Sequence, residues 1–277
     1  MQENPPFLDQ ELFFAHLKAS RLGLPFRHFP TLPSTNQYLL DEAAREAPEG
    51  MLAVAEAQTA GRGRHRRLWH SPPGKNLYFS LLLWPDTSPL RLSQLAMVTA
   101  LALREAVLRQ APALPLALKW PNDLWLQGRK LSGILCECPP QEKEGRRGIV
   151  LGVGLNVNSL PEDFPPELRE TATSLLWHVG TPFSRERLLA DFCNALQPLY
   201  EQWLPEENLA PFLPLWRAHD ALAGREIAVD RPNGRVTGTL LGYTDQGLML
   251  LKTPQGVETI SAGDVHVRPL PQRPAQG

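Results

Sequence analysis

One segment stands out for the chemistry that its residue types could perform. Gly61-Arg62-Gly63-Arg64-His65-Arg66-Arg67 holds four arginines and two glycines in seven residues. Glycine lets a backbone approach a ligand closely, and each guanidinium offers several donors to carboxylate or phosphate oxygens. The segment predicts an anion-binding loop, but a solvated basic loop or a nucleic-acid-binding patch would have the same composition.

Other polar and charged residues follow or begin segments with the pattern of β-strands. Lys119 starts Lys-Trp-Pro-Asn-Asp, Lys130 begins the next strand-like run, and Gly152-Val-Gly-Leu-Asn156 ends a third. Sites on sheets commonly lie where strands end, which favours one shared site. Ser34-Thr35-Asn36 offers donors and acceptors for a neutral polar group, although an N-cap is the commoner role of such a cluster.

In this order and spacing, the motifs resemble the biotin protein ligase family, in its monofunctional form without an N-terminal DNA-binding domain. The resemblance runs from about Pro33 to Asn158. It rests on S-T-N, Q-x-x-G-R-G-R-x-x-R-x-W, K-W-P-N-D-L, R-K-L-x-G-I-L and G-x-G-x-N. The resemblance implies that ATP and Mg²⁺ activate biotin as biotinyl-5'-AMP with release of pyrophosphate. Biotin then passes to a specific lysine of a biotin carboxyl carrier protein or domain.

The resemblance also implies roles for individual residues. The expected catalytic residues are Lys130, Arg64 and Asp123. The residues expected to bind biotin are Ser34, Thr35, Asn36, Gln58, Arg62, Gly63, Arg64 and Lys130. Those expected to face the nucleotide are Arg64, Trp69, Lys119, Asn122 and Asn156, with Mg²⁺ near Asp123 and no firm set of metal ligands.

The expected fold is α+β. The resemblance implies a catalytic domain over residues 1–222, with a mixed β-sheet backed by helices, and a small SH3-like β-barrel over 223–270. Short β-rich pieces separated by Gly-containing turns after Gly224 agree with the barrel. Residues 271–277 are expected to be a flexible tail. Within the first domain the patterns predict helices near 9–21, 34–47, 93–109 and 184–203, and strands near 26–29, 51–56, 77–84, 116–120, 130–138 and 148–156.

Two departures from the family pattern concern the arginine loop and the N-terminus. Arg66 stands where the family usually has glycine, which leaves the flexibility of the loop and the role of Arg67 open. We expect the loop to be mobile without ligand and to become ordered when biotin or its adenylate binds, because its cations repel one another and little holds it closed. Only 33 residues precede Ser34, too few for the winged helix-turn-helix of bifunctional members, so we expect no repressor function.

Composition limits the class of protein. The 277 residues carry a net charge of −1, which disfavours a nucleic-acid-binding protein, and no apolar run is long enough to span a membrane. Cys136, Cys138 and Cys193 predict reduced thiols and a cytoplasmic protein. A lipoate or octanoate ligase is the nearest alternative enzyme, but its Arg-Arg-x-x-Gly-Gly-Gly segment is missing. A homodimer stays open.

Overall fold

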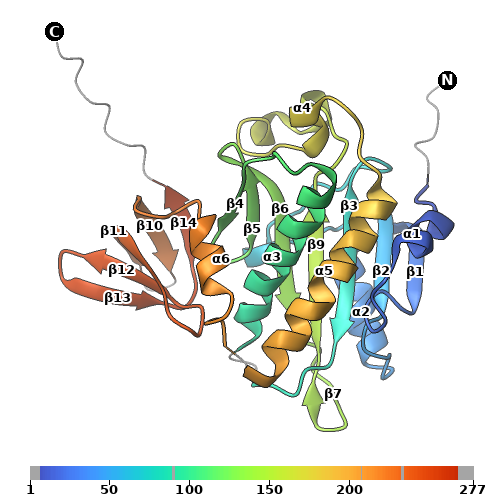
Figure 1. The fold of residues 1–277 in the computed structure, drawn as a ribbon, viewed down its shortest axis with the longest axis horizontal. Coiled ribbons are helices and arrows are strands. Elements are labelled where there is room, and N and C mark those ends of the chain that lie inside the picture. The colour runs from blue at the N-terminus through green and yellow to red at the C-terminus, as the bar shows by residue number, and fades with distance from the viewer. Residues whose placement is uncertain (1–6, 89–90, 207, 232–233, 268–277) are drawn as a thin grey trace.

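A mixed seven-stranded sheet forms the centre of the molecule in this computed structural model (Figure 1), which describes residues 7–88, 91–206, 208–231 and 234–267. Its strand order is β1-β2-β3-β9-β6-β5-β4, and only the β1–β2 pair is parallel. The strands are β1 (Phe26–Leu32), β2 (Leu52–Gln58), β3 (Leu77–Leu83), β4 (Leu116–Lys119), β5 (Asp123–Leu126), β6 (Arg129–Glu137) and β9 (Ile149–Leu155).

Helices cover both faces of this sheet. The long helices α3 (Leu92–Gln110) and α5 (Arg185–Glu206) lie side by side over one face, and α1 (Gln10–His16) packs on α5 (Figure 1). Helix α2 (Thr35–Ala43) packs against β2, β3 and β9 in a separate apolar cluster. Alternation along β3 explains the two clusters, because Leu81 and Leu83 join the α3–α5 core whereas Leu82 joins the α2 cluster.

The C-terminal part is a five-stranded antiparallel sheet with the order β13-β12-β11-β10-β14. Its strands are β10 (Glu226–Arg231), β11 (Gly234–Tyr243), β12 (Met249–Thr253), β13 (Gly256–Ile260) and β14 (Asp264–Val267). The expected small β domain is therefore confirmed, but the sheet is not closed into a barrel. Within the described residues β13 and β14 do not pair, so they remain its two edges. The expected tail, 271–277, lies outside the described residues.

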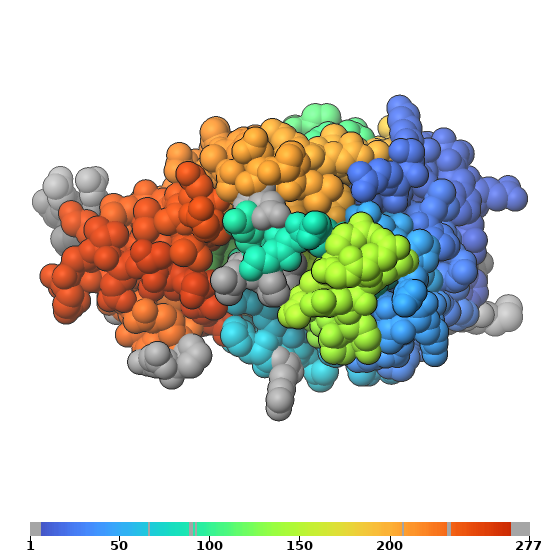
Figure 2. Space-filling view, turned by 90° about the horizontal axis from the view of Figure 1, so that it is seen from below, coloured from blue at the N-terminus to red at the C-terminus, as the bar shows by residue number. Residues whose placement is uncertain are grey.

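The two sheets share one buried apolar core. Ile227 and Met249 of the small sheet belong to the same cluster as Leu101 of α3 and Trp216 of α6 (Leu213–Ala218). The buried Trp120 indole donates a hydrogen bond of 2.9 Å to the carbonyl of Gly247 and so crosses from one sheet to the other. Seen from below (Figure 2), the small sheet occupies one end of the molecule and the N-terminal residues occupy the opposite end.

Short elements account for most differences from the sequence prediction. One strand was expected over 116–120, with a tight connection at Gln127–Arg129 to the next, whereas Asp123–Leu126 forms a further strand, β5, before the Gln127–Gly128 turn. The hairpin β7 (Glu142–Lys143) and β8 (Arg146–Arg147) and the helices α4 (Leu175–Val179) and α6 were also not predicted. The expected first helix is shorter, and α2 ends at Ala43 rather than Ala47. No described helix is both long enough and apolar enough to cross a membrane.

Candidate active site

A cavity of about 500 Å³ lies on the sheet face that also carries α2. The arginine loop, strand ends of the large sheet, the segment before α4 and residues 263–266 of the small sheet all line it. Every residue that the sequence analysis assigned to the site borders this cavity. These residues are Ser34, Thr35, Asn36, Gln58, Arg62, Gly63, Arg64, Trp69, Lys119, Asn122, Asp123, Lys130 and Asn156.

Glycines of the large sheet make room for the side chains of the site. A Cβ atom on Gly152 would lie 2.0 Å from Asn36 Oδ1, and one on Gly154 would lie 2.3 Å from Trp69 Cε2. Real Cβ atoms do not make contacts this short, so a side chain at either position would displace Asn36 or Trp69. The G-x-G motif of β9 thus places the asparagine of α2 and the tryptophan of the loop against the sheet.

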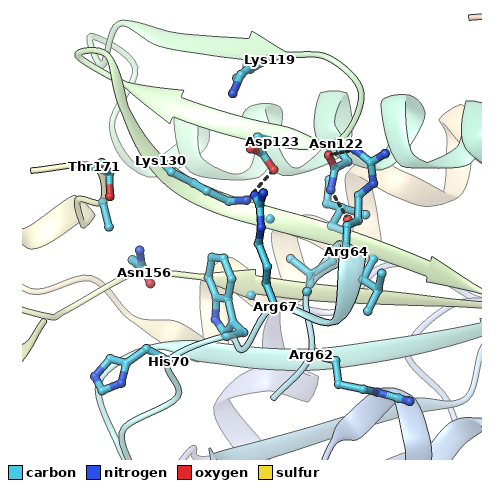
Figure 3. Close-up of a pocket in the computed structure, with 18 of the residues that line it drawn as sticks. Arg62, Arg64, Arg67, His70, Lys119, Asn122, Asp123, Lys130, Asn156 and Thr171 are labelled. Atoms are coloured by element: carbon cyan, nitrogen blue, oxygen red, sulfur yellow. Dashed lines mark hydrogen bonds and ion pairs between the residues drawn. The ribbon is translucent and has the colours of Figure 1, made fainter. Parts of the chain in front are cut away.

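Cations and a carboxylate meet at one side of the cavity (Figure 3). Lys130 Nζ lies 2.7 Å from Asp123 Oδ1 and 5.5 Å from the centre of the Trp69 ring. Lys119 Nζ lies 4.5 Å over the Trp125 ring, and burial lowers the pKa of this lysine. Lys119 and Lys130 therefore place two amino groups on the same side of the cavity.

The arginine loop has a partner for each arginine whose side chain is described. Arg64 Nη1 donates to Asn122 Oδ1 at 3.3 Å, Arg62 Nη2 lies 3.3 Å from Glu137 Oε2, and Arg67 Nη2 lies 2.5 Å from Asp264 Oδ2. The expectation that little holds the unliganded loop closed is therefore wrong, whereas its mobility stays a prediction. Carboxylate and amide oxygens from three other segments offset the repulsion between its cations.

The loop backbone turns sharply at its centre. Residues 64–66 form a single 3-10 turn in which His65 has a left-handed conformation with φ of 55°. Arg66, the residue in place of the family's glycine, belongs to this turn, while its side chain lies outside the described atoms. Burial lowers the pKa of Arg64, the arginine that starts the turn.

The closed end of the cavity is polar and neutral. The backbone N–H of Thr35 donates to Gln58 Oε1 at 2.9 Å, and Gln58 Nε2 donates to Ser71 Oγ at 3.2 Å. Ser34 Oγ accepts from the Gln37 N–H at 3.4 Å as the N-cap of α2, so the structural role considered for this cluster is confirmed. The same serine borders the cavity.

Two asparagines of the site hold the surrounding backbone. Asn122 Nδ2 donates to the carbonyl of Ile134 at 2.6 Å, and Asn156 Nδ2 donates to the carbonyl of Thr173 at 2.9 Å. Both side chains are buried and border the cavity, and Asn122 Oδ1 accepts from Arg64 (Figure 3). Each NH2 group therefore holds a backbone carbonyl of the cavity wall, while the amide oxygen stays available to Arg64 or to a ligand.

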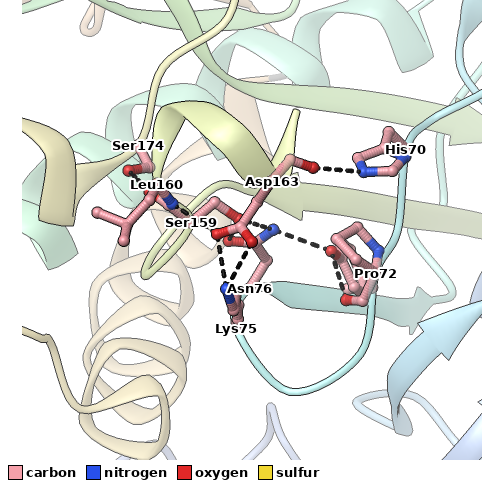
Figure 4. A network of polar contacts seen from close by, with 9 residues as sticks. His70, Pro72, Lys75, Asn76, Ser159, Leu160, Asp163 and Ser174 are labelled. Atoms are coloured by element: carbon pink, nitrogen blue, oxygen red, sulfur yellow. Dashed lines mark hydrogen bonds and ion pairs between the residues drawn. The ribbon is translucent and has the colours of Figure 1, made fainter. Parts of the chain in front are cut away.

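A segment that the sequence analysis did not assign to the site crosses its rim (Figure 4). Lys75 Nζ lies 2.6 Å from Asp163 Oδ1, and the His70 ring contacts the Asp163 carbonyl at 3.1 Å. Further along, the Lys130 N–H donates to the Thr171 carbonyl at 2.8 Å. Phe164 and Leu168 of this segment line the cavity. Its irregular structure and its prolines gave no sequence signal for a binding role.

Some donors around the cavity have no protein acceptor. The indole nitrogens of Trp69 and Trp125 and the Nε of Arg62 are buried without a hydrogen-bond partner among the described residues. A buried donor without a partner costs free energy, which a bound ligand can recover. Trp125 and Asp264, which line the cavity, and Glu137, which contacts Arg62 of the loop, were not assigned from the sequence, because nothing in their local motifs indicates these positions.

Comparisons with known proteins agree with this geometry. The model of the biotin/lipoate A/B protein ligase family matches residues 28–156, and that of the biotin protein ligase C terminal domain matches 223–268. The bifunctional ligase/repressor BirA of Bacillus subtilis is 34% identical over 251 residues, covering 91% of this chain and 76% of the relative. The biotin–[acetyl-CoA-carboxylase] ligase of Mycobacterium tuberculosis is 36% identical over 243 residues, covering 85% and 86%.

A solved structure gives the same result for the fold. Biotin protein ligase from Aquifex aeolicus in complex with biotin and ATP has a TM-score of 0.76 and 29% identity, covering 88% of this chain and 98% of that one. This chain belongs to the biotin/lipoate A/B protein ligase family. Within that family it is a biotin protein ligase, an ATP-dependent ligase.

Proposed function

We propose that this chain activates biotin with ATP to biotinyl-5'-AMP and pyrophosphate, and then transfers biotin to a lysine of a biotin carboxyl carrier protein or domain. The observation that carries the proposal is the division of one cavity into two chemically different parts. Its closed end offers the neutral groups of Ser34, Thr35 and Gln58, and its other side carries Lys119 and Lys130. A neutral cyclic urea suits the first part, and a carboxylate meeting a phosphate suits the second.

The residue roles follow from the charge that must be offset. Attack of the biotin carboxylate on the α-phosphate brings two anions together, and fixed cations stabilise that transition state. Lys130 and Arg64 are the proposed catalytic cations, while Arg62, Gly63 and Asn36 belong to the biotin side.

The remaining assigned residues form the nucleotide side of the cavity. Trp69, Lys119, Asn122 and Asn156 are proposed to contact the nucleotide. Asp123, beside Lys130, is the proposed base or orienting group for the carrier lysine in the transfer step.

Magnesium fits this cavity only as a companion of ATP. No group of three or more His, Cys, Asp or Glu side chains in the described ranges is arranged to hold a metal ion. The carboxylates on the lining are Asp123, Glu170 and Asp264, and the first and last already pair with cations. Mg²⁺ at such a site keeps most of its ligands from phosphates and water, with Asp123 as the nearest candidate side chain, and offsets phosphate charge there.

Several further properties are part of the proposal. The catalytic domain comprises 1–222, the C-terminal domain 223–270 and the tail 271–277, which the match of the C-terminal family model over 223–268 supports. The net charge of −1 supports the absence of a nucleic-acid partner, and free thiols at all three cysteines support a cytoplasmic location.

Mass spectrometry of a biotin carboxyl carrier domain tests the function directly. The domain is incubated with this protein, biotin, ATP and Mg²⁺, and should gain the mass of one biotinyl group only when ATP is present. Without carrier, the protein should still release pyrophosphate and retain biotinyl-adenylate. Pyrophosphate release that requires the carrier would contradict the two-step scheme.

A further inference from the structure

Glu137, the last residue of β6, lies behind the cavity wall and joins two segments of the site. Its Oε2 accepts a hydrogen bond of 2.8 Å from Asn36 Nδ2 and lies 3.3 Å from Arg62 Nη2. Asn36 belongs to α2 and Arg62 to the arginine loop, so one carboxylate oxygen connects both segments to the sheet. Glu137 does not itself line the cavity, so its influence on a ligand must pass through these neighbours.

The carboxylate determines which way the Asn36 amide faces. Asn36 Nδ2 lies 2.8 Å from the Glu137 oxygen and 3.3 Å from the Leu135 carbonyl, and both of these oxygens can only accept. The amide must therefore direct its NH2 group toward β6. Its Oδ1 then faces the opposite way, 2.5 Å from Ser80 Oγ.

This orientation fixes the hydrogens of the next two hydroxyl groups. Ser80 is fully buried, and its single hydroxyl hydrogen must go to Asn36 Oδ1, which can only accept. Thr35 Oγ1 lies 2.7 Å from Ser80 Oγ and 3.3 Å from Gln58 Oε1, and its single hydrogen can go to either oxygen. Because the Ser80 hydrogen goes to Asn36 Oδ1, the shorter contact with Ser80 takes the hydrogen of Thr35. The Thr35 oxygen keeps its lone pairs free on the cavity side.

A second acceptor lies beside it. The Thr35 N–H donates to Gln58 Oε1 at 2.9 Å, which fixes that amide with its oxygen toward α2. With its hydrogen directed to Ser80, the Thr35 hydroxyl does not use the longer contact of 3.3 Å to the Gln58 carbonyl oxygen, and both oxygens are left as acceptors. A ligand group with N–H donors, such as a cyclic urea, can donate hydrogen bonds to these two oxygens.

We propose that Glu137 is a positioning and specificity-determining residue, which holds the closed end of the pocket in an acceptor state for the ureido N–H groups of biotin. It acts through Asn36, Ser80 and Thr35, and balances the charge of Arg62 at the same time. This inference rests on the proposed function, since it names the ligand of the same site.

The test is Glu137→Gln in biotin-dependent exchange of pyrophosphate into ATP. A glutamine side chain can present either an NH2 group or an oxygen to Asn36, so the amide and the two hydroxyls lose their fixed direction. The KM for biotin should rise by about tenfold or more, as loss of a hydrogen bond to a charged group implies, while kcat and the KM for ATP change by less than about threefold. Glu142→Gln is the matched control, because that carboxylate also has an arginine partner, Arg147 at 3.1 Å, but lies outside the cavity.

A second variant separates positioning from simple structural support. In the double variant Asn36→Asp with Glu137→Gln, the amide and carboxylate exchange places, so their hydrogen bond, the local charge and an acceptor toward Ser80 are all kept. The double variant should recover most of the biotin KM that Glu137→Gln loses, while Asn36→Asp alone should be worse than the double. An unchanged biotin KM in Glu137→Gln, or a double variant no better than the worse single variant, would overturn the proposal. Absence of any biotin-dependent exchange in the unmodified protein would instead refute the proposed function.

Discussion

Arg67 Nη2 and Asp264 Oδ2 lie 2.5 Å apart, although 197 residues separate them in the chain. His65 of the same loop lies 3.5 Å from the other oxygen of this carboxylate. The first residue of β14 thus holds the arginine loop against the C-terminal sheet. The small sheet contributes directly to the geometry of the active site.

Asp264→Asn should loosen the arginine loop. The change removes the charge that holds Arg67, so limited trypsin digestion of the free protein should cut within 62–67 faster than in the unmodified protein. Glu258→Gln is the matched control, because that carboxylate pairs with Arg231 in the same sheet and does not line the cavity. Equal rates in Asp264→Asn and the control would show that the ion pair does not restrain the loop.

Biotin and ATP should protect the same loop in the unmodified protein. Anionic oxygens supplied by the ligands give Arg64 and its neighbours additional contacts, which offset an ordering entropy of about 1 kcal/mol per residue. Tryptic cleavage within 62–67 should slow when both ligands are present. The effect is limited by the partners that the loop already has, namely Glu137, Asn122 and Asp264. Cleavage at the same rate with and without ligands would place the adenylate away from this loop.

Lys130→Ala should slow adenylate formation by about two orders of magnitude, or about 3 kcal/mol in the transition state. The variant removes a cation from the cavity and leaves Asp123 without its partner at 2.7 Å. Pre-steady-state release of pyrophosphate measures the step. Lys252→Ala, at an exposed position of β12, should keep the unmodified rate. Normal adenylation in Lys130→Ala would remove this lysine from the mechanism.

Glu56→Gln should destabilise the fold in a pH-dependent way. Burial by itself raises the pKa of Glu56, but hydrogen bonds from His28, Arg185 and the Leu8 N–H outweigh it and lower the pKa to about 2. A lowered pKa stabilises the fold above the ordinary value of 4.5, and this stabilisation is lost as the pH falls toward 2. The difference corresponds to about 3 kcal/mol.

Urea denaturation at a series of pH values measures this contribution. At pH 7 the variant should unfold at lower urea than the unmodified protein, and the two midpoints should converge between pH 5 and 2, the range set by the two pKa values. Glu144→Gln, which removes an exposed ion pair with Arg146, should have little effect at any pH. A gap that stays constant over this range would mean that the charge of Glu56 is not the cause.

Gly154→Ala should impair both substrates at once. The added Cβ would lie 2.3 Å from Trp69 Cε2, so the indole must move out of its place beside Lys130. Overpacking of this kind costs about 1–3 kcal/mol, and kcat/KM for biotin and for ATP should fall by about tenfold or more. Combining the change with Trp69→Leu, which vacates the space, should cost less than the sum of the two single effects. Strict additivity would show that the glycine is not needed for the tryptophan.

The sequence showed which motifs could do chemistry, but not which residues hold those motifs in place. The assigned residues all lie in local motifs whose chemistry is visible in a few adjacent letters, and all border the cavity. Glu137 and Asp264 gave no such signal, because their partners Arg62 and Arg67 come from another part of the chain. Pairing of distant segments decides such contacts, and local composition does not encode it.

In the fold, the long elements were predictable from the sequence and the short ones were not. Helices α3 and α5 bury continuous apolar faces, and the sequence predicted both. Strand β5 has only four residues, with a partly exposed Trp125, so it gave too few alternations to be distinguished from a turn. Closure of the small sheet also depends on how its edge strands meet, which no periodicity reveals.

The indole of Trp120 and the apolar cluster around it have a consequence for the mechanics of the protein. Since Trp120 donates to Gly247 and both sheets contribute to one core, the C-terminal sheet cannot swing away from the catalytic sheet as a rigid lid without exposing apolar surface to water. Substrate exchange must therefore depend on the local segments at the rim, the arginine loop and residues 160–172. The two sheets keep their relative positions, and they should unfold together in one cooperative transition when the protein is heated or treated with denaturant.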